Sequence, residues 1–248
     1  MTGAIWAAIP VAPLDRAKTR LSGLLSPVER AAFALAMAED LFDALAGCPR
    51  LARVLVVTSD RTVAGLASRH GFDQVGDDGG GPTRAIATAL AHVAGNRCDG
   101  FLALMGDLPL VRPGDIARML PAGDPTPQVR IAPARNGIGT NAIFCAPPGA
   151  IPMVFNGAGF AVNRAQAEAA GLPVAICPNP RLALDVDWPE DLAAVLEFPV
   201  ATRAQKFLIE WQATRPVLKS VFSPALKMDA PCQAACPHFP QMSRCPYR

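Results

Sequence analysis

Short apolar runs alternate with longer amphipathic stretches through most of the chain. Brief, wholly apolar runs that end in turns are typical of strands buried in a parallel sheet. These runs predict strands at 4–11, 53–58, 72–75, 101–105, 129–132, 141–145 and 173–177. The stretches between them predict helices at 27–45, 61–70, 84–93, 113–120, 161–170 and from residue 189. This alternation predicts an α/β fold, a three-layer α/β/α sandwich with a mostly parallel sheet.

Three acidic residues follow predicted strands or precede a predicted helix. The run FLALMGDLPL at 101–110 places Asp107 directly after a strand. Ligands of open α/β sheets bind outside the carboxyl ends of the strands, where a carboxylate can hold a divalent metal. Asp185 and Asp187 alternate before the helix that Pro189 begins, so they face the same way in an extended chain. Together these acids are a candidate metal site, and capping of the neighbouring turn or helix is the competing role for Asp107 and Asp187.

Three loops carry further candidate groups. Arg16, Lys18 and Arg20 follow the first strand, where cations can bind a polyphosphate; an ordinary solvated loop is the alternative. A glycine-rich loop at 76–83 opens the next helix, whose N-terminus can receive an anion or a purine edge. This loop matches neither a Walker A motif nor a GxGxxG fingerprint, so a plain linker is its alternative. A second glycine loop at 155–160 precedes another helix.

Composition narrows the class of protein. The 248 residues are 51% hydrophobic, enough for a sizeable core, and the net charge is +2. No basic run indicates a nucleic-acid or membrane partner. The apolar N-terminus lacks the positive region of a signal peptide, and no apolar stretch approaches the ~20 residues of a spanning helix. We therefore expect a soluble cytoplasmic protein, with reduced thiols at Cys48, Cys98, Cys145 and Cys177.

The character of the chain changes near residue 200. We expect one domain over 1–200, followed over 201–248 by a helix at 203–213 and a flexible tail that contains Pro and Cys. The few periodic apolar positions of this segment predict that it buries little surface against the body. Three cysteines and His238 lie within 232–245, a suitable number for zinc. Their C-x3-C-x-H-x6-C spacing favours a flexible tail instead.

Several motifs in this order resemble the phospholactate guanylyltransferase family of deazaflavin-cofactor biosynthesis, within the molybdopterin-guanylyltransferase-like nucleotidyltransferases. The matching segments are IPVAPLDRAKTRL, SPVERAAFALAMAEDLFDAL, VVTSD, GDLPL, NGIGTNAIF and LDVDWPEDL, and the resemblance ends near Leu196. It implies a Rossmann-like nucleotidyltransferase fold over 1–200. It also implies that a phosphate oxygen of an acceptor attacks the α-phosphorus of GTP and that pyrophosphate leaves. The acceptor is a small phosphorylated carboxylic acid: 2-phospholactate, phosphoenolpyruvate and 3-phosphoglycerate are all open.

The same resemblance implies roles for individual residues. Asp107 and Lys18 would be catalytic, and Asp107 with Asp185 or Asp187 would hold Mg²⁺. The implied nucleotide-binding residues are Arg16, Lys18, Arg20, Thr58, Pro82 and Thr83. The implied acceptor-binding residues are Thr140, Asn141, Asn156 and Gly159. The chain departs from the family at Asn156, Gly159 and Asn163, which stand for Gly, Ser and His, and at Trp188, which stands for Thr and should weaken the cap of the last helix.

Two other functions compete with this interpretation. One is a nucleotidyltransferase for a molybdopterin or a sugar phosphate; the chain lacks the G-x-S-x-R-M-G-type loop that the molybdopterin alternative would have. The other is a non-catalytic nucleotide-binding protein. Clustered carboxylates repel one another when no metal is bound. The presence of these carboxylates therefore argues against a protein that has lost its catalytic activity. A homodimer is left open.

Overall fold

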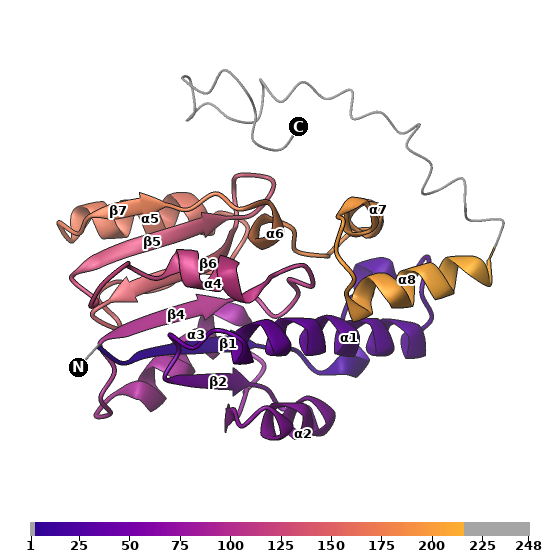
Figure 1. The fold of residues 1–248 in the computed structure, drawn as a ribbon, viewed down its shortest axis with the longest axis horizontal. Helices are drawn as coiled ribbons and strands as arrows, with labels where there is room; N and C mark the ends of the chain where they lie inside the picture. Colours follow the sequence, from indigo (N-terminus) through magenta and orange to yellow (C-terminus); the bar gives the residue numbers. More distant parts are fainter. Residues whose placement is uncertain (1–2, 216–248) are drawn as a thin grey trace, which may run out of the picture.

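The computed structural model describes residues 3–215 and contains a seven-stranded sheet with helices on both faces (Figure 1). The strands are β1 (Ile5–Pro10), β2 (Arg53–Val57), β3 (Asp73–Val75), β4 (Gly100–Leu104), β5 (Gln128–Pro133), β6 (Thr140–Ala146) and β7 (Val174–Ile176). Their order across the sheet is β3-β2-β1-β4-β6-β5-β7. Within the described residues, β6 is the strand that runs antiparallel to its neighbours, β4 and β5. The predicted sandwich with a mostly parallel sheet is confirmed.

Most of the helices begin where local signals in the sequence predict them. They are α1 (Pro27–Ala46), α2 (Arg61–Arg69), α3 (Pro82–Val93), α4 (Pro113–Met119), α5 (Gly159–Ala169), α6 (Pro180–Ala183), α7 (Pro189–Glu197) and α8 (Arg203–Ala213), with short 3-10 helices η1 (Leu14–Arg16) and η2 (Thr19–Leu21). At α1, the Ser26 hydroxyl accepts from Glu29 N, and the Glu29 carboxylate accepts from Ser26 N, so two terminal N–H groups are satisfied.

Two helices begin earlier than predicted, and one was not predicted. Helix α3 starts at Pro82 because Gly81, at φ +82°, turns the chain and the proline ring suits the first helical position. Helix α5 starts at Gly159 rather than at residue 161. The four-residue helix α6 is too short to show a periodic pattern; the Asn179 side chain caps it by accepting from the next two N–H groups.

Alternate residues of the strands enter two separate cores, one on each face of the sheet. In β1, Ile5, Ala7 and Ile9 pack with α1, α2, α4 and α6–α8, whereas Trp6 and Ala8 pack with α3 and α5. Because helices cover both faces, each central strand is apolar on both sides, which explains the continuous apolar runs in the sequence. No helix within residues 3–215 is long and apolar enough to cross a membrane.

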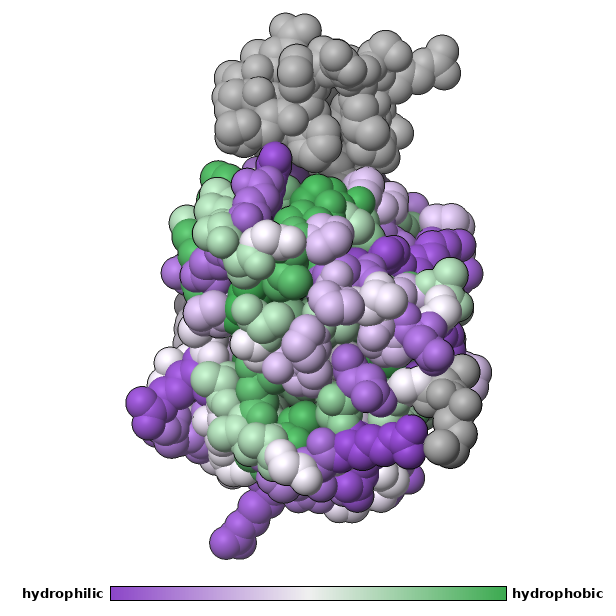
Figure 2. Space-filling model, turned by 90° about the vertical axis from the view of Figure 1, so that its left-hand side faces the viewer, coloured by the Kyte–Doolittle hydropathy of each residue, from purple (hydrophilic) through white to green (hydrophobic). Residues whose placement is uncertain are grey.

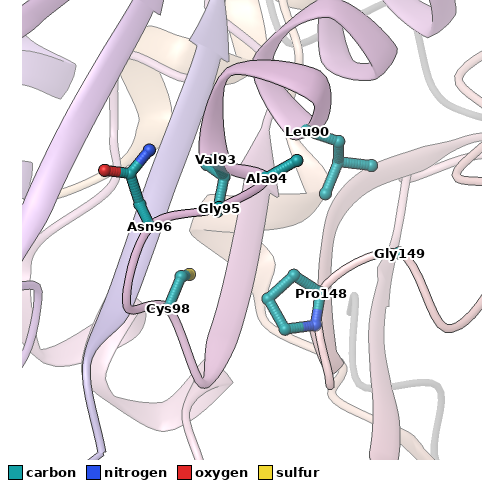
Figure 3. Close-up of a pocket in the computed structure, with 8 residues that line it drawn as sticks. All are labelled: Leu90, Val93, Ala94, Gly95, Asn96, Cys98, Pro148 and Gly149. Atoms are coloured by element: carbon teal, nitrogen blue, oxygen red, sulfur yellow. The ribbon is translucent and has the colours of Figure 1, made fainter.

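The amino ends of the parallel strands form a mixed surface. Figure 2 shows this end of the molecule, where apolar residues lie among charged ones. A cavity of about 220 Å³ lies here, between the end of α3 and the loop after β6 (Figure 3). It is lined by Leu90, Val93, Ala94, Gly95, Asn96, Cys98, Pro148 and Gly149. Burial raises the pKa of the Cys98 thiol to about 11, so this group stays protonated and unreactive at neutral pH.

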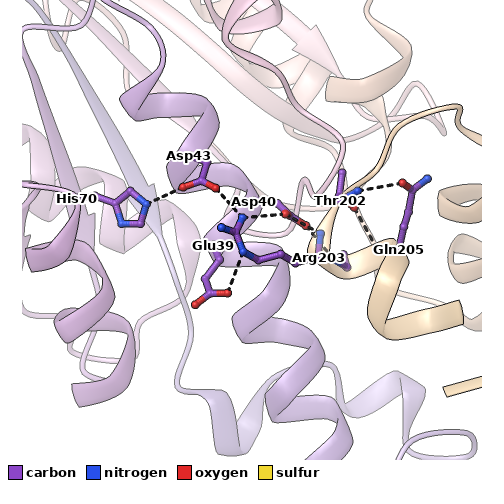
Figure 4. A network of polar contacts seen from close by, with 8 residues as sticks. Glu39, Asp40, Asp43, His70, Thr202, Arg203 and Gln205 are labelled. Carbon is purple, nitrogen blue, oxygen red and sulfur yellow. Dashed lines mark hydrogen bonds and ion pairs between the residues drawn. The ribbon is translucent and has the colours of Figure 1, made fainter. Parts of the chain in front are cut away.

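Helix α8 is part of the body of the protein. Its Leu208 and Trp211 are buried in the same core as α1, and Phe207 stacks on Phe33 of α1 with ring centroids 5.4 Å apart. Arg203 extends this contact with ion pairs to α1, including one of 2.6 Å to Asp43 (Figure 4). The helix predicted at 203–213 is confirmed, but the prediction that it buries little surface is wrong. The cysteines and histidine at 232–245 lie outside the described residues.

Candidate active site

The topology of the sheet gathers three segments at one edge. Asp107 follows β4, and β6 begins at Thr140 beside it because β6 runs in the opposite direction. The register is fixed by Met105 N, which donates to Asn141 O over 2.9 Å. Val186 N donates to Asp107 O over 3.3 Å, which brings the 185–187 segment to the same place. Residues that are far apart in sequence therefore meet at the carboxyl end of β4.

A cavity of about 510 Å³ opens at this edge. It is lined by Arg20, Met105, Asp107, Ala134, Arg135, Asn136, Gly139, Thr140, Asn141, Phe155, Asn156, Gly157, Asp185, Asp187, Trp188 and Asp191. The lining combines carboxylates, two guanidinium groups and neutral hydrogen-bonding groups. Such a site suits a small, charged ligand better than an apolar one. The structure thus brings together predicted residues from the cationic loop, the acidic segments and the acceptor loops.

Lys18 lies between two of the predicted acids. Its Nζ donates to Asp107 Oδ2 over 2.6 Å and to Asp187 Oδ1 over 3.2 Å, while Arg20 donates to the other Asp187 oxygen over 2.6 Å. The backbone of Lys18 is left-handed, with φ of 53°, and its side chain is only 9% exposed. Burial acts to lower the pKa of Lys18, but the charges of Asp107 and Asp187 outweigh it and raise that pKa. Lys18 is therefore a fixed cation.

Asp107 and Asp185 have unfavourable surroundings without a further cation. Asp107 Oδ1 is buried and has no hydrogen-bond partner among the described residues. Burial and the nearby charge of Asp107 raise the pKa of Asp185, although Asn141 Nδ2 donates to Asp185 over 3.0 Å. Carboxylate oxygens in this condition are chemically suited to a hard divalent ion.

The third predicted metal ligand is engaged elsewhere. Asp187 pairs with Lys18 and Arg20, and residues 3–215 contain no group of three acidic, His or Cys side chains arranged for one metal ion. A magnesium site stays a prediction, and Asp107 with Asp185 is the pair that fits it best.

Asn163 orients the predicted acceptor residue Thr140. Asn163 is fully buried, and its side-chain amide donates to Thr140 Oγ1 over 3.2 Å and exchanges two hydrogen bonds with the backbone of Val154. Because Thr140 Oγ1 accepts from Asn163, its own proton is left to donate to a ligand in the cavity. A Cβ on Gly159 would lie 2.6 Å from the Val154 carbonyl oxygen, so this close packing requires glycine there.

Five predicted nucleotide-binding residues lie outside the lining of this cavity: Arg16, Lys18, Thr58, Pro82 and Thr83. Thr58 Oγ1 accepts from Asp60 N at the start of α2. The Thr83 hydroxyl accepts from Phe155 N over 2.9 Å and donates to Phe155 O over 3.2 Å. Thr83 therefore joins the first turn of α3 to the loop before α5.

The remaining acceptor candidates have structural partners as well. Asn141 Nδ2 donates to Asp185 and to the carbonyls of Leu182 and Ala183, so its amide positions the acidic segment. Asn156 lines the cavity and accepts from Ala158 N over 2.9 Å.

Two charged lining residues, Arg135 and Asp191, were missed in the sequence. Arg135 pairs with Asp191, whose other oxygen accepts from the N–H groups of Asp187 and Trp188. Asp191 thereby supplies the cap of α7 that Trp188 does not provide through its side chain. Trp188 is 54% exposed, and the Arg20 guanidinium lies 4.9 Å from its ring centroid. Arg135 immediately precedes the NGIGT segment, and that position was the signal that could have identified it.

The fold is similar to that of solved nucleotidyltransferase structures. A nucleotidyl transferase from Methanothermobacter has a TM-score of 0.60 to this structure at 17% identity, covering 84% of this chain and 99% of that one. A protein from Desulfovibrio desulfuricans assigned as a nucleotide-diphospho-sugar transferase has a TM-score of 0.69 at 16% identity, covering 86% and 96%.

Sequence comparison identifies the family. The family described as "Guanylyl transferase CofC like" matches residues 5–218, which extends beyond Leu196 and through α8. A phosphoenolpyruvate guanylyltransferase of Rubrobacter xylanophilus is 37% identical over 189 residues, 76% of this chain and 92% of that protein. Another from Conexibacter woesei is 36% identical over 204 residues, 80% and 90% of the two chains. The chain belongs to the CofC-like guanylyltransferase family and is an enzyme of the nucleotidyltransferase class, which confirms the resemblance.

Proposed function

We propose that this enzyme transfers GMP from GTP to phosphoenolpyruvate and releases pyrophosphate. The observation that carries the proposal is the charged cavity at the carboxyl end of β4, which is lined by Asp107 and Thr140, with Lys18 paired to Asp107. The relatives named phosphoenolpyruvate guanylyltransferase favour that acceptor over 2-phospholactate and 3-phosphoglycerate. We further assign the reaction to deazaflavin coenzyme biosynthesis in the cytoplasm.

The proposed chemistry joins two anions, so charge neutralisation and positioning are its main requirements. Lys18 would donate from Nζ to the triphosphate, with Arg20 beside it. Asp107 and Asp185 would hold Mg²⁺, which when bound would neutralise charge on the reacting phosphates. Both carboxylates are suited to this role because one has an unpartnered buried oxygen and the other has a raised pKa.

The acceptor would occupy the side of the cavity formed by β6 and the loop before α5. The Thr140 proton is available there because Asn163 already donates to the Thr140 oxygen. A charge-assisted hydrogen bond from this hydroxyl to the acceptor phosphate would orient the attacking oxygen toward the nucleotide.

The test is a product assay with the purified full chain. Protein, Mg²⁺ and GTP are incubated with each of the three phosphoacids, and the product mass is determined; ATP and CTP replace GTP in parallel. We expect the mass of a diphosphate-linked guanosine product with phosphoenolpyruvate. Asp107→Asn, which keeps the shape and removes the charge, serves as the inactive control. Product with another nucleotide, or GTP consumed only with an acceptor that is not a phosphoacid, would overturn the proposal.

A further inference from the structure

Arg135 is a positive side chain placed on the wall of the acceptor cavity without an assigned role. It follows β5 and lies in the turn that leads to β6, where Ala134 N donates to Gly139 O over 2.9 Å. Thr140 stands at the other end of the same turn. The Arg135 side chain is 41% exposed, and both residues line the cavity. Arg135 and Thr140 are therefore both available to a ligand bound in this cavity.

The guanidinium is held in place but keeps most of its donors. Within the described residues, Nη2 is the atom of this group that makes a hydrogen bond, to Asp191. Asp191 is itself fixed, because its second oxygen caps α7 and its side chain is 8% exposed. An arginine that is anchored through one nitrogen can still present the remaining N–H groups of its planar fork to a carboxylate.

The cavity is lined by more acidic than basic side chains, so an acceptor with two anionic groups needs a positive side chain as a partner for its second group. Asp107, Asp185, Asp187 and Asp191 line the cavity, and the positive lining residues within 3–215 are Arg20 and Arg135. Arg20 already pairs with Asp187 and covers the Trp188 ring. Lys18 pairs with Asp107 and Asp187. Arg135 is the cation on the Thr140 side that has unused donors.

We propose that Arg135 binds the carboxylate of the acceptor and thereby selects phosphorylated carboxylic acids over other phosphate monoesters. Thr140 then contacts the phosphate, and Asp191 positions Arg135. This inference rests on the proposed function and adds the residue that recognises the second anionic group.

The test compares two acceptors that differ in that group. Phosphoenolpyruvate carries a carboxylate where isopropenyl phosphate carries a methyl group, and the phosphate ester is the same. In the unaltered enzyme, kcat/KM should be higher for phosphoenolpyruvate by about two orders of magnitude. Arg135→Met should remove most of that preference by lowering kcat/KM for phosphoenolpyruvate about 30- to 100-fold, with isopropenyl phosphate changed less than threefold. Arg135→Lys should keep part of the preference, because it retains the charge but loses the fork.

Two controls separate the possible failures. Arg164→Met removes an exposed arginine of α5 that pairs with Glu168, and it should change neither acceptor. The Kd of GTP, measured by calorimetry, should stay within about twofold in Arg135→Met, which verifies a folded nucleotide site. Equal losses for both acceptors, or an unchanged preference, would overturn the role of Arg135. If the unaltered enzyme forms no product with any phosphoacid, the proposed function fails. Binding of phosphoenolpyruvate, measured by calorimetry and abolished in Arg135→Met, would still support the carboxylate site. Equal binding of phosphoenolpyruvate to both proteins would overturn it.

Discussion

The Asp185 side chain is held in an environment that opposes its charge. Its burial and the nearby Asp107 carboxylate raise its pKa, so its ionised form costs stability in the folded protein at neutral pH. Asp185→Asn should therefore raise the melting temperature of the metal-free enzyme at pH 7 while lowering turnover. A gain on the order of 1 kcal/mol would correspond to about 2–4 °C in a protein of this size.

The pH dependence of this difference in melting temperature provides a control. A group with a raised folded pKa destabilises the protein above that pKa and ceases to do so once it is protonated. The difference in melting temperature between the two proteins should shrink as the pH falls through the raised pKa of Asp185. A lower melting temperature for Asp185→Asn at pH 7 would show that the Asn141 hydrogen bond outweighs the repulsion.

Thr140 offers a second residue-scale prediction. Thr140→Val keeps the branched shape and removes the hydroxyl, which also takes away the acceptor of one Asn163 hydrogen bond, while Asn163 retains its bonds to Val154. A hydrogen bond to a charged group contributes roughly 1.5–3 kcal/mol, so kcat/KM for the acceptor should fall about ten- to a hundredfold. The Kd of GTP should stay within about twofold. Separate titrations of GTP and acceptor test this, and a parallel loss of both affinities would return Thr140 to a purely structural role.

At the scale of elements, we expect the stability of the protein to depend on α8, a helix far from the cavity. Leu208, a residue of α8, is fully buried, whereas the adjacent Ile209 is 59% exposed. Leu208→Ala should lower the free energy of unfolding by about 2–5 kcal/mol because it leaves a void in the core. Ile209→Ala, on the same helix, should change it by less than about 0.5 kcal/mol. Urea unfolding compares the two, and equal small effects would mean that α8 docks weakly.

Local signals explain why most elements could be predicted. The capping box at Ser26 and Glu29 and the Asp60 cap depend on residues within one turn, so the sequence displays them directly. The docking of α8 could not be predicted in this way. Its apolar positions are few, and their burial depends on α1, which supplies Phe33 more than a hundred residues earlier in the chain.

At the scale of the whole molecule, the Thr83 hydroxyl connects the glycine loop at 76–83 to the glycine loop at 155–160. Thr83 makes both of its hydrogen bonds with the backbone of Phe155, which lies in the lining of the cavity. Thr83→Val would leave two backbone groups unpaired at a cost of about 1–3 kcal/mol. We expect the KM of the acceptor to rise about tenfold, because the loop beside it loosens. Thr88→Val removes a hydroxyl of the same helix that donates only to Arg84 O, and it should leave both KM values unchanged.

The pairing within the cavity depends on topology, which limits what the sequence could reveal. Asp107, Asp185 and Asp187 were identifiable because each stands next to a recognisable strand or helix signal. The ion pair of Lys18 with Asp107 spans 89 positions, and that of Arg135 with Asp191 spans 56. Neither separation has a periodic signature, so the partners become evident only when β1, β4 and β6 lie side by side. Motif resemblance located the loops, but not which side chains within them face one another.

The left-handed turn at Lys18 gives the resting enzyme an internal counter-ion. Its ammonium group pairs with Asp107 and Asp187 from within the chain and, together with Arg20, offsets the charges of these two carboxylates. A triphosphate that draws Lys18 toward itself would take this partner from Asp107, while Asp187 would remain paired with Arg20. Entry of the proposed nucleotide would then be an exchange of ionic partners, and it would make Asp107 a better ligand for the proposed divalent ion. By linkage, the proposed nucleotide and ion would then favour each other's binding.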